Sequence, residues 1–219
     1  MLTLEDVKQC KAVNTYITKA DESLNALGFT EHNFAHVTKV SDDAGYILKT
    51  LGFPESDVEL ARISGYLHDI GNLVNRQDHS LTGALMAFRL LENLGFEPND
   101  IATVTTAIGN HDEGSGYPVN QVSAALILAD KSDVRRSRVR NKDAAVFDIH
   151  DRVNYSVKKA ILRINEERTI VKLKLSIDTK YGSVMDYFEI FLGRMIMCRK
   201  AAEKLNLQFK LIINEQQLI

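Results

Sequence analysis

Apolar residues recur every three or four positions over most of the first 165 residues, which is the period of a helix that buries one face. Several of these stretches end in Leu-Gly-Phe or Leu-Asn-Leu. In such sequences Gly or Asn can take the left-handed conformation that closes a helix, and the next apolar residue contacts the last turn. The pattern predicts helices over 3–26, 32–51, 55–70, 79–94, 98–110, 119–134 and 148–165.

The period changes to two near residue 170. Apolar and polar residues alternate over 171–177 and over 207–213, as in strands with one buried face, and an amphipathic helix is predicted between them over 183–205. A two-stranded sheet is too small to be stable alone. We therefore predict a mostly α-helical protein with a helical domain over 1–165. A small strand-helix-strand appendage over 166–219 packs on that domain or on a second copy of the chain.

Composition places the chain among ordinary globular proteins, with 219 residues, 45% of them apolar, 26% charged, and a net charge of −2. Cys10 and Cys198 stand far apart without CxxC spacing, which predicts core thiols in a reducing compartment. Neither a membrane-spanning run nor a signal-peptide pattern is present in the sequence given. We expect a cytoplasmic protein, and the net charge gives no reason to expect binding to nucleic acid or membranes.

Four of the six histidines and two aspartates occur where the helical pattern brings polar groups to inward faces. His36, for example, leads the apolar series that continues at Val40 and Ala44. A buried Asp is costly unless it is paired or bound to metal, and inward imidazoles and carboxylates on neighbouring helices commonly form metal sites. The candidate ligands are His36, His68, Asp69, His79, His111 and Asp130.

The order of these six residues resembles the two-metal form of the HD superfamily of metal-dependent phosphohydrolases, over the segment from Glu31 to Asp130. The resemblance implies two metal ions, with Asp69 as the bridging carboxylate and a bridging hydroxide that attacks phosphorus. The ligands of the first ion would be His36, His68, Asp69 and Asp130, and those of the second His79, His111 and Asp69. Imidazole and carboxylate ligands favour iron, manganese, zinc, cobalt or nickel over magnesium alone.

The loop after His111, NHDEGSGYP, is partly similar to the signature of the HD-GYP branch, which cleaves cyclic dinucleotides. That branch has a pair of histidines, of which the first is replaced by Asn110 here, and it has a lysine where Asn72 stands. These departures argue against cleavage of cyclic di-GMP, and the glycines and the proline of this loop also fit a turn.

Two further histidines have open roles. His32 lies one helical turn before His36 and could either reach a third metal or lie at the rim. His150-Asp151 is a second His-Asp pair like His68-Asp69. Because it lies at the start of a predicted helix, it more simply caps that helix or lines the rim of the site.

A strongly basic run follows Asp130. Its cations are Lys131, Arg135, Arg136, Arg138, Arg140 and Lys142. The spacing places Lys131, Arg135 and Arg138 on one helix face, which we expect to contact the phosphates of a substrate. Arg136 and Arg140 fall on another face and fit a solvated surface.

The predicted function is metal-dependent hydrolysis of a phosphate ester or anhydride, with a nucleotide or dinucleotide as the expected substrate class. Asp69 and Asp130 would hold the ions, while Lys131 and Arg135 would stabilise the developing negative charge. A di-iron HD-type oxygenase and a non-catalytic nucleotide-sensing module are the alternatives. Because two strands leave unpaired edges, we also expect a homodimer formed through the appendage, with a monomer as the alternative.

Overall fold

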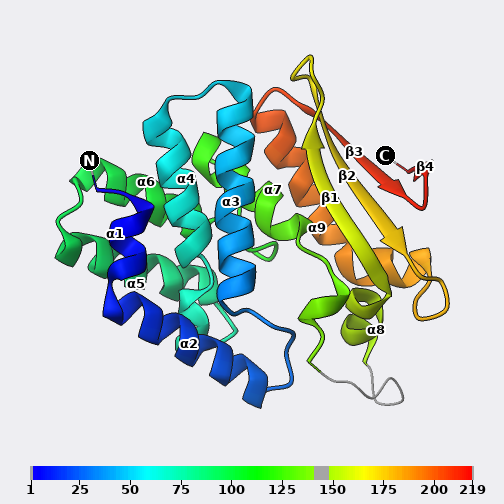
Figure 1. Cartoon of the computed structure of the whole chain (residues 1–219), viewed down its shortest axis with the longest axis horizontal. Coiled ribbons are helices and arrows are strands. Elements are labelled where there is room, and N and C mark those ends of the chain that lie inside the picture. The colour runs from blue at the N-terminus through cyan, green and yellow to red at the C-terminus, as the bar shows by residue number, and fades with distance from the viewer. Residues whose placement is uncertain (1, 141–147, 219) are drawn as a thin grey trace.

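The computed structural model describes residues 2–140 and 148–218, in which a helical body carries a small sheet on one side (Figure 1). The body consists of α1 (Leu4–Gln9), α2 (Lys11–Ala26), α3 (Phe34–Leu51), α4 (Glu55–Leu67), the 3-10 turn η1 (Ile70–Leu73), α5 (His79–Leu94), α6 (Pro98–Gly109), α7 (Gln121–Ser132), the 3-10 turn η2 (Arg136–Arg138) and α8 (Ile149–Ser156). The predicted mostly helical fold class is confirmed.

Helix boundaries follow from local chemistry. At the start of α3 the Asn33 side chain accepts a hydrogen bond of 2.9 Å from the backbone N–H of Ala35. Gly52 closes the same helix with φ of 83°, and Gly95 closes α5 with φ of 84°. The Leu-Gly-Phe sequences therefore mark helix ends as predicted. Among the described residues, no helix is both long and apolar enough to cross a membrane.

The sheet contains β1 (Val157–Ile164), β2 (Ile170–Ile177), β3 (Gln208–Ile213) and β4 (Gln216–Gln217), in that spatial order. β1 and β2 pair antiparallel, whereas β2 and β3 pair parallel. Parallel neighbours need a crossover, and α9 (Val184–Lys204) supplies it. α9 packs against both α7 and β3, so it joins the inner face of the sheet to the helical body (Figure 1).

The prediction of one helix over 148–165 was wrong in its second half. α8 ends at Ser156, and residues 157–164 form β1, whose Leu162 faces Leu173 of β2. In this short segment the helical and strand periods cannot be told apart, and pairing with β2 decides between them. The sheet therefore has four strands and begins before residue 166. The homodimer was predicted because a two-stranded sheet leaves unpaired edges, and a four-stranded sheet removes that reason. The homodimer stays a prediction. The division into two domains also stays a prediction.

Two smaller predictions also differ from the structure. The expected helix over 3–26 is broken at Cys10, whose ψ of 113° is extended. The expected helix over 119–134 ends at Ser132.

Cys198 is a buried thiol, as predicted, and burial raises its pKa to about 12, whereas Cys10 is only partly buried.

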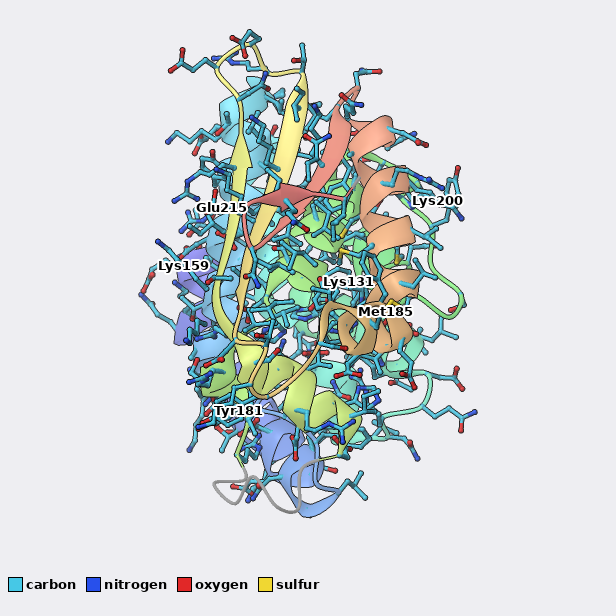
Figure 2. All side chains as sticks on the ribbon, turned by 90° about the vertical axis from the view of Figure 1, so that its right-hand side faces the viewer. Lys131, Lys159, Tyr181, Met185, Lys200 and Glu215 are labelled. Carbon is cyan, nitrogen blue, oxygen red and sulfur yellow. The ribbon has the colours of Figure 1, made fainter. Side chains whose placement is uncertain are left out.

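A row of like charges crosses the outer face of the sheet. Lys172 of β2 lies directly opposite Arg163 of β1 and Lys210 of β3. Within residues 2–140 and 148–218, none of the three has a carboxylate partner. Figure 2 shows this side of the molecule, with Lys159 of β1 at its edge. Directly opposed like charges destabilise a sheet, so this row lowers stability.

We expect Lys172→Glu to raise the free energy of unfolding by about 0.5 to 2 kcal/mol, because two repulsive cross-strand pairs become attractive. Urea denaturation measures the change. Lys174→Glu is the matched control, since it alters net charge equally but faces Ile161 and Ile212. A Lys172→Glu variant no more stable than the Lys174→Glu variant would show that the opposed charges cost nothing.

Candidate metal centre

All six candidate ligands lie together in the helical body. They come from α3 (His36), the turn that follows α4 (His68 and Asp69), the start of α5 (His79), the segment just after α6 (His111) and α7 (Asp130). Possible ligand atoms lie within 4.8 Å of one another in two groups, His36 with His68 and Asp130, and His68 with Asp69 and His111. The four histidines and Asp69 are buried, and 13% of the Asp130 side chain is exposed.

A close approach of two segments brings His68-Asp69 next to His79. Gly71 of η1 lies against the first turn of α5, where an added Cβ would lie 2.0 Å from the carbonyl oxygen of His79. Only glycine fits this contact. The turn after Asp69 can therefore pack on α5, and Asp69 Oδ1 lies 3.6 Å from His79 Nε2.

Hydrogen bonds at Nδ1 fix the orientation of the imidazole rings. His68, His79 and His111 each donate from Nδ1 to the carbonyl oxygen three residues earlier, at 2.8, 3.1 and 2.6 Å. Because a carbonyl oxygen only accepts, Nδ1 carries the proton, and Nε2 of each neutral ring presents a lone pair to the cluster. His36 uses Nδ1 in the same way, donating to Asp133 Oδ2 at 2.8 Å.

The Nε2 atoms face one another. The distance is 3.3 Å between His36 and His68, and 3.2 Å between His79 and His111. Between two neutral rings these lone pairs cannot form a hydrogen bond, so either a proton on one Nε2 or a metal ion between the rings is needed to make the contact favourable. Ligands about 2.1 Å from a shared tetrahedral ion lie about 3.4 Å apart, which these distances match. The donor set therefore fits a transition-metal site.

The two carboxylates complete the cluster. Asp69 Oδ2 lies 3.2 Å from His68 Nε2 and 3.4 Å from His36 Nε2, while its Oδ1 faces His79. Asp130 Oδ1 lies 3.5 Å from both His36 Nε2 and His68 Nε2. Asp69 thus offers one oxygen to each side of the cluster, as a bridging ligand does.

Electrostatics show that the cluster needs positive charge. Burial lowers the pKa of His68, but Asp69 and Asp130 outweigh burial and raise this pKa to about 10. Burial likewise acts to raise the pKa of Asp69, yet the neighbouring histidines hold it well below its usual range. At His111, burial and the charge of His68 lower the pKa well below the ordinary value. Protons or metal cations can supply the charge that the carboxylates require.

Asp133 belongs to the site although the sequence analysis did not identify it as a candidate. It is fully buried, accepts the hydrogen bond from His36 Nδ1, and lies 2.9 Å from Arg135 Nε. Burial acts to raise its pKa, but His36 and the neighbouring arginines hold it below its usual range. A carboxylate behind a ligand histidine fixes the ring and increases its basicity. The sequence did contain a signal for Asp133, because it follows the candidate ligand Asp130 by three residues.

The three predicted phosphate contacts do not share a helix face, because α7 ends before Arg135. Lys131 is buried and forms ion pairs of 2.8 Å with Asp130 and 2.7 Å with Glu113. Arg138 is also buried, and it donates to the carbonyl oxygens of Glu31 and Asp133. Substrate binding by Lys131, Arg135 and Arg138 stays a prediction.

The remaining members of the basic run have structural partners or lie outside the described residues. Arg136 stacks on Tyr155, with its guanidinium carbon 4.4 Å from the ring centroid. Arg140 forms an ion pair with Asp21. Lys142 lies outside the described residues.

The loop after His111 is a tight turn, as one interpretation predicted. A Cβ at Gly116 would lie 2.3 Å from the carbonyl oxygen of Asn110. Glu113 of this loop pairs with both Lys131 and Arg194. Asn72, where the HD-GYP branch has lysine, donates to Asp69 Oδ1 at 3.0 Å and thereby orients that carboxylate.

A cavity of about 330 Å³ lies beside the cluster. Its wall includes Arg76, whose Nη1 is 4.0 Å from Asp69 Oδ1, and His32, whose ring centroid is 5.5 Å from that of His36. Arg194 of α9 also lines it. Sequence periodicity gave no signal for Arg76 or Arg194, because segments far apart in the chain bring them here. His150 and Asp151 line the same cavity, whereas the cap of α8 is Asp148.

The family model for the HD domain matches residues 33–172. An uncharacterized protein of Methanocaldococcus jannaschii is 27% identical over 184 residues, which cover 73% of this chain and 70% of that protein. Endonuclease MutS2 of Finegoldia magna is 23% identical over 150 residues, covering 68% of this chain but 17% of the endonuclease.

The chain is also similar to the crystal structure of a predicted HD superfamily hydrolase from an uncultured Thermotogales bacterium. The two share 24% sequence identity with a TM-score of 0.46, and the match covers 57% of this chain and 68% of the other.

We expect Asp133→Asn to weaken metal binding about 10- to 100-fold, because the amide is a poorer acceptor for the His36 Nδ1 proton. Competition with a chromophoric chelator measures the affinity. Asp42→Asn, at an exposed position of the same helix as His36, is the control and should bind metal like the wild type. Equal affinity in a folded Asp133→Asn variant would remove Asp133 from the site.

Proposed function

The chain belongs to the HD domain family, and from that premise we propose that it is a metal-dependent phosphohydrolase acting on a phosphate ester or anhydride of a small molecule. The observation that carries the proposal is the convergence of imidazole lone pairs and two carboxylates next to a cavity lined by arginines. Such a cluster suits cations, and such a cavity suits a phosphate.

Two divalent transition-metal ions fit the donor set, and iron, manganese, zinc, cobalt and nickel all match its chemistry. One would be held by His36, His68, Asp69 and Asp130, and the other by Asp69, His79 and His111. When bound, such ions supply Lewis acidity toward phosphoryl oxygens and make a nearby water more acidic.

The protein's own groups orient the reactants. Buried Asn72 donates a hydrogen bond to Asp69, and Arg76 approaches Asp69 from the cavity. Lys131 forms ion pairs with both Asp130 and Glu113. The pKa of Lys131 is raised because Asp130 and Glu113 outweigh the effect of burial, so the ammonium group stays charged. A fixed cation next to Asp130 offsets the negative charge that a phosphate brings to the site.

The choice of cavity follows from charge. A larger cavity of about 440 Å³ between α1 and α4 is lined by Glu5, Glu55 and Glu59 together with Lys8 and Arg62. In the wall of the other cavity, by contrast, Arg76 lies 4.0 Å from the candidate ligand Asp69. Glutamates disfavour a phosphate anion. The arginine-lined cavity beside the cluster is therefore the proposed substrate site, and a phosphorylated small molecule such as a nucleotide is the proposed substrate class.

The two-ion assignment predicts that the purified protein holds close to two transition-metal ions per chain and that Asp69→Ala loses both the metal and the activity. Mass spectrometry of the metals gives the content. Asp42→Ala serves as the control, and circular dichroism establishes that both variants are folded. Full occupancy in the Asp69→Ala variant would contradict the bridging role.

The proposed reaction predicts phosphate release from at least one member of a panel of nucleotides and sugar phosphates, with the same rate under air and under argon. A chelator should abolish the release and added metal should restore it. Turnover that requires oxygen and releases no phosphate would instead establish the oxygenase. A metal-loaded protein that binds nucleotides without turnover would be a sensing module.

A further inference from the structure

We propose that Arg194 of α9 binds a phosphate group of the substrate, so that the C-terminal unit sets specificity for a small phosphomonoester. This inference rests on the proposed function. Arg194 lies outside the residues matched by the HD domain model, which end at 172, so family membership alone does not account for it.

The guanidinium of Arg194 is held in the cavity wall but is only partly used. Its Nε donates to Glu113 at 2.9 Å, and its carbon lies 4.5 Å from the ring centroid of Phe191. Neither Nη1 nor Nη2 has a partner within residues 2–140 and 148–218. Burial acts to lower the pKa of Arg194, but Glu113 and Asp130 raise it, so the group stays charged. A partly desolvated arginine with two free N–H₂ groups is suited to bidentate contact with phosphate.

Arg76 offers a second guanidinium to the same cavity from the helical body. Its Nη1 donates to Asn72 at 3.2 Å, and its carbon lies 5.8 Å from the ring centroid of Phe29. Both Phe29 and Phe191 line the cavity. Two arginines, each next to an aromatic ring, therefore reach the cavity from separate parts of the chain. A phosphate beside the candidate metal ligands could accept hydrogen bonds from both.

The remaining wall limits the rest of the substrate. Asp148, Asp151 and Asn154 of the α8 region line the cavity together with three arginines, of which Arg138 is already bonded to two backbone carbonyl oxygens. The carboxylates of Asp148 and Asp151 accept hydrogen bonds from hydroxyl groups and repel additional phosphates. The volume of about 330 Å³ is near the lower end of the range of about 300 to 1,000 Å³ for small-molecule pockets. One phosphate on a small hydroxylated group fits this wall better than a triphosphate or a cyclic dinucleotide.

The test compares Arg194→Ala, Arg194→Lys and Arg199→Ala, each loaded with metal. Arg199 lies on the same helix, its side chain is 57% exposed, and it forms an ion pair of 4.0 Å with Glu203, which makes it the matched control. Steady-state kinetics on the best phosphomonoester gives KM and kcat, and inorganic phosphate serves as the competitive probe. Metal content and circular dichroism are measured for every variant.

We expect Arg194→Ala to raise both KM and the inhibition constant of phosphate about tenfold or more, since a charge-assisted contact is lost, while metal content is unchanged. Arg194→Lys, which keeps the charge but loses the planar fork, should give an intermediate value, and it remains informative if the alanine variant fails to fold. The Arg199→Ala variant should match the wild type. Values within twofold of wild type in both Arg194 variants overturn the inference.

A measurement of phosphate binding tests this inference independently of the proposed hydrolase function. If the wild type hydrolyses no phosphomonoester, calorimetry with inorganic phosphate and the metal-loaded protein still tests Arg194 directly. Binding weakened by Arg194→Ala then supports the phosphate site although the hydrolase proposal fails, whereas equal binding overturns both. Faster turnover of a cyclic dinucleotide than of any phosphomonoester would overturn the substrate class.

Discussion

Imidazole lone pairs that face each other at 3.2 to 3.3 Å in a buried space are unfavourable without a positive charge between them. Much of the helical body holds them in this arrangement. Carbonyl oxygens fix the Nδ1 protons of three rings, Asp133 fixes the fourth, and Gly71 allows the His68-Asp69 turn to approach α5. The fold thus maintains a cluster that requires protons or metal cations, and the proposed metal site rests on that constraint.

The site extends beyond the helical body through a chain of ion pairs. Asp130 contacts Lys131, Lys131 contacts Glu113, and Glu113 contacts Arg194 on α9. α9 is also the crossover between β2 and β3, so the position of Arg194 depends on the sheet. The C-terminal unit therefore contributes Phe191 and Arg194 to the cavity wall.

Sequence patterns predicted the position of a side chain correctly where the apolar periodicity of one helix determines which face is buried. His36 and Asp130 could be placed on inward faces because apolar neighbours repeat with the helical period, and the six candidate ligands do lie together. The pattern failed over 157–164, where pairing with a distant strand outweighed local periodicity. It also gave no indication of Arg76 or Arg194, because their shared cavity is formed only by long-range packing.

The most direct test is anomalous X-ray diffraction from crystals of the metal-loaded protein, recorded on both sides of the metal's absorption edge. The account predicts one peak among His36, His68, Asp69 and Asp130, and a second among Asp69, His79 and His111. Crystals of a metal-loaded protein without a peak in this cluster, with the imidazole rings turned so that their Nε2 atoms point elsewhere, would contradict it.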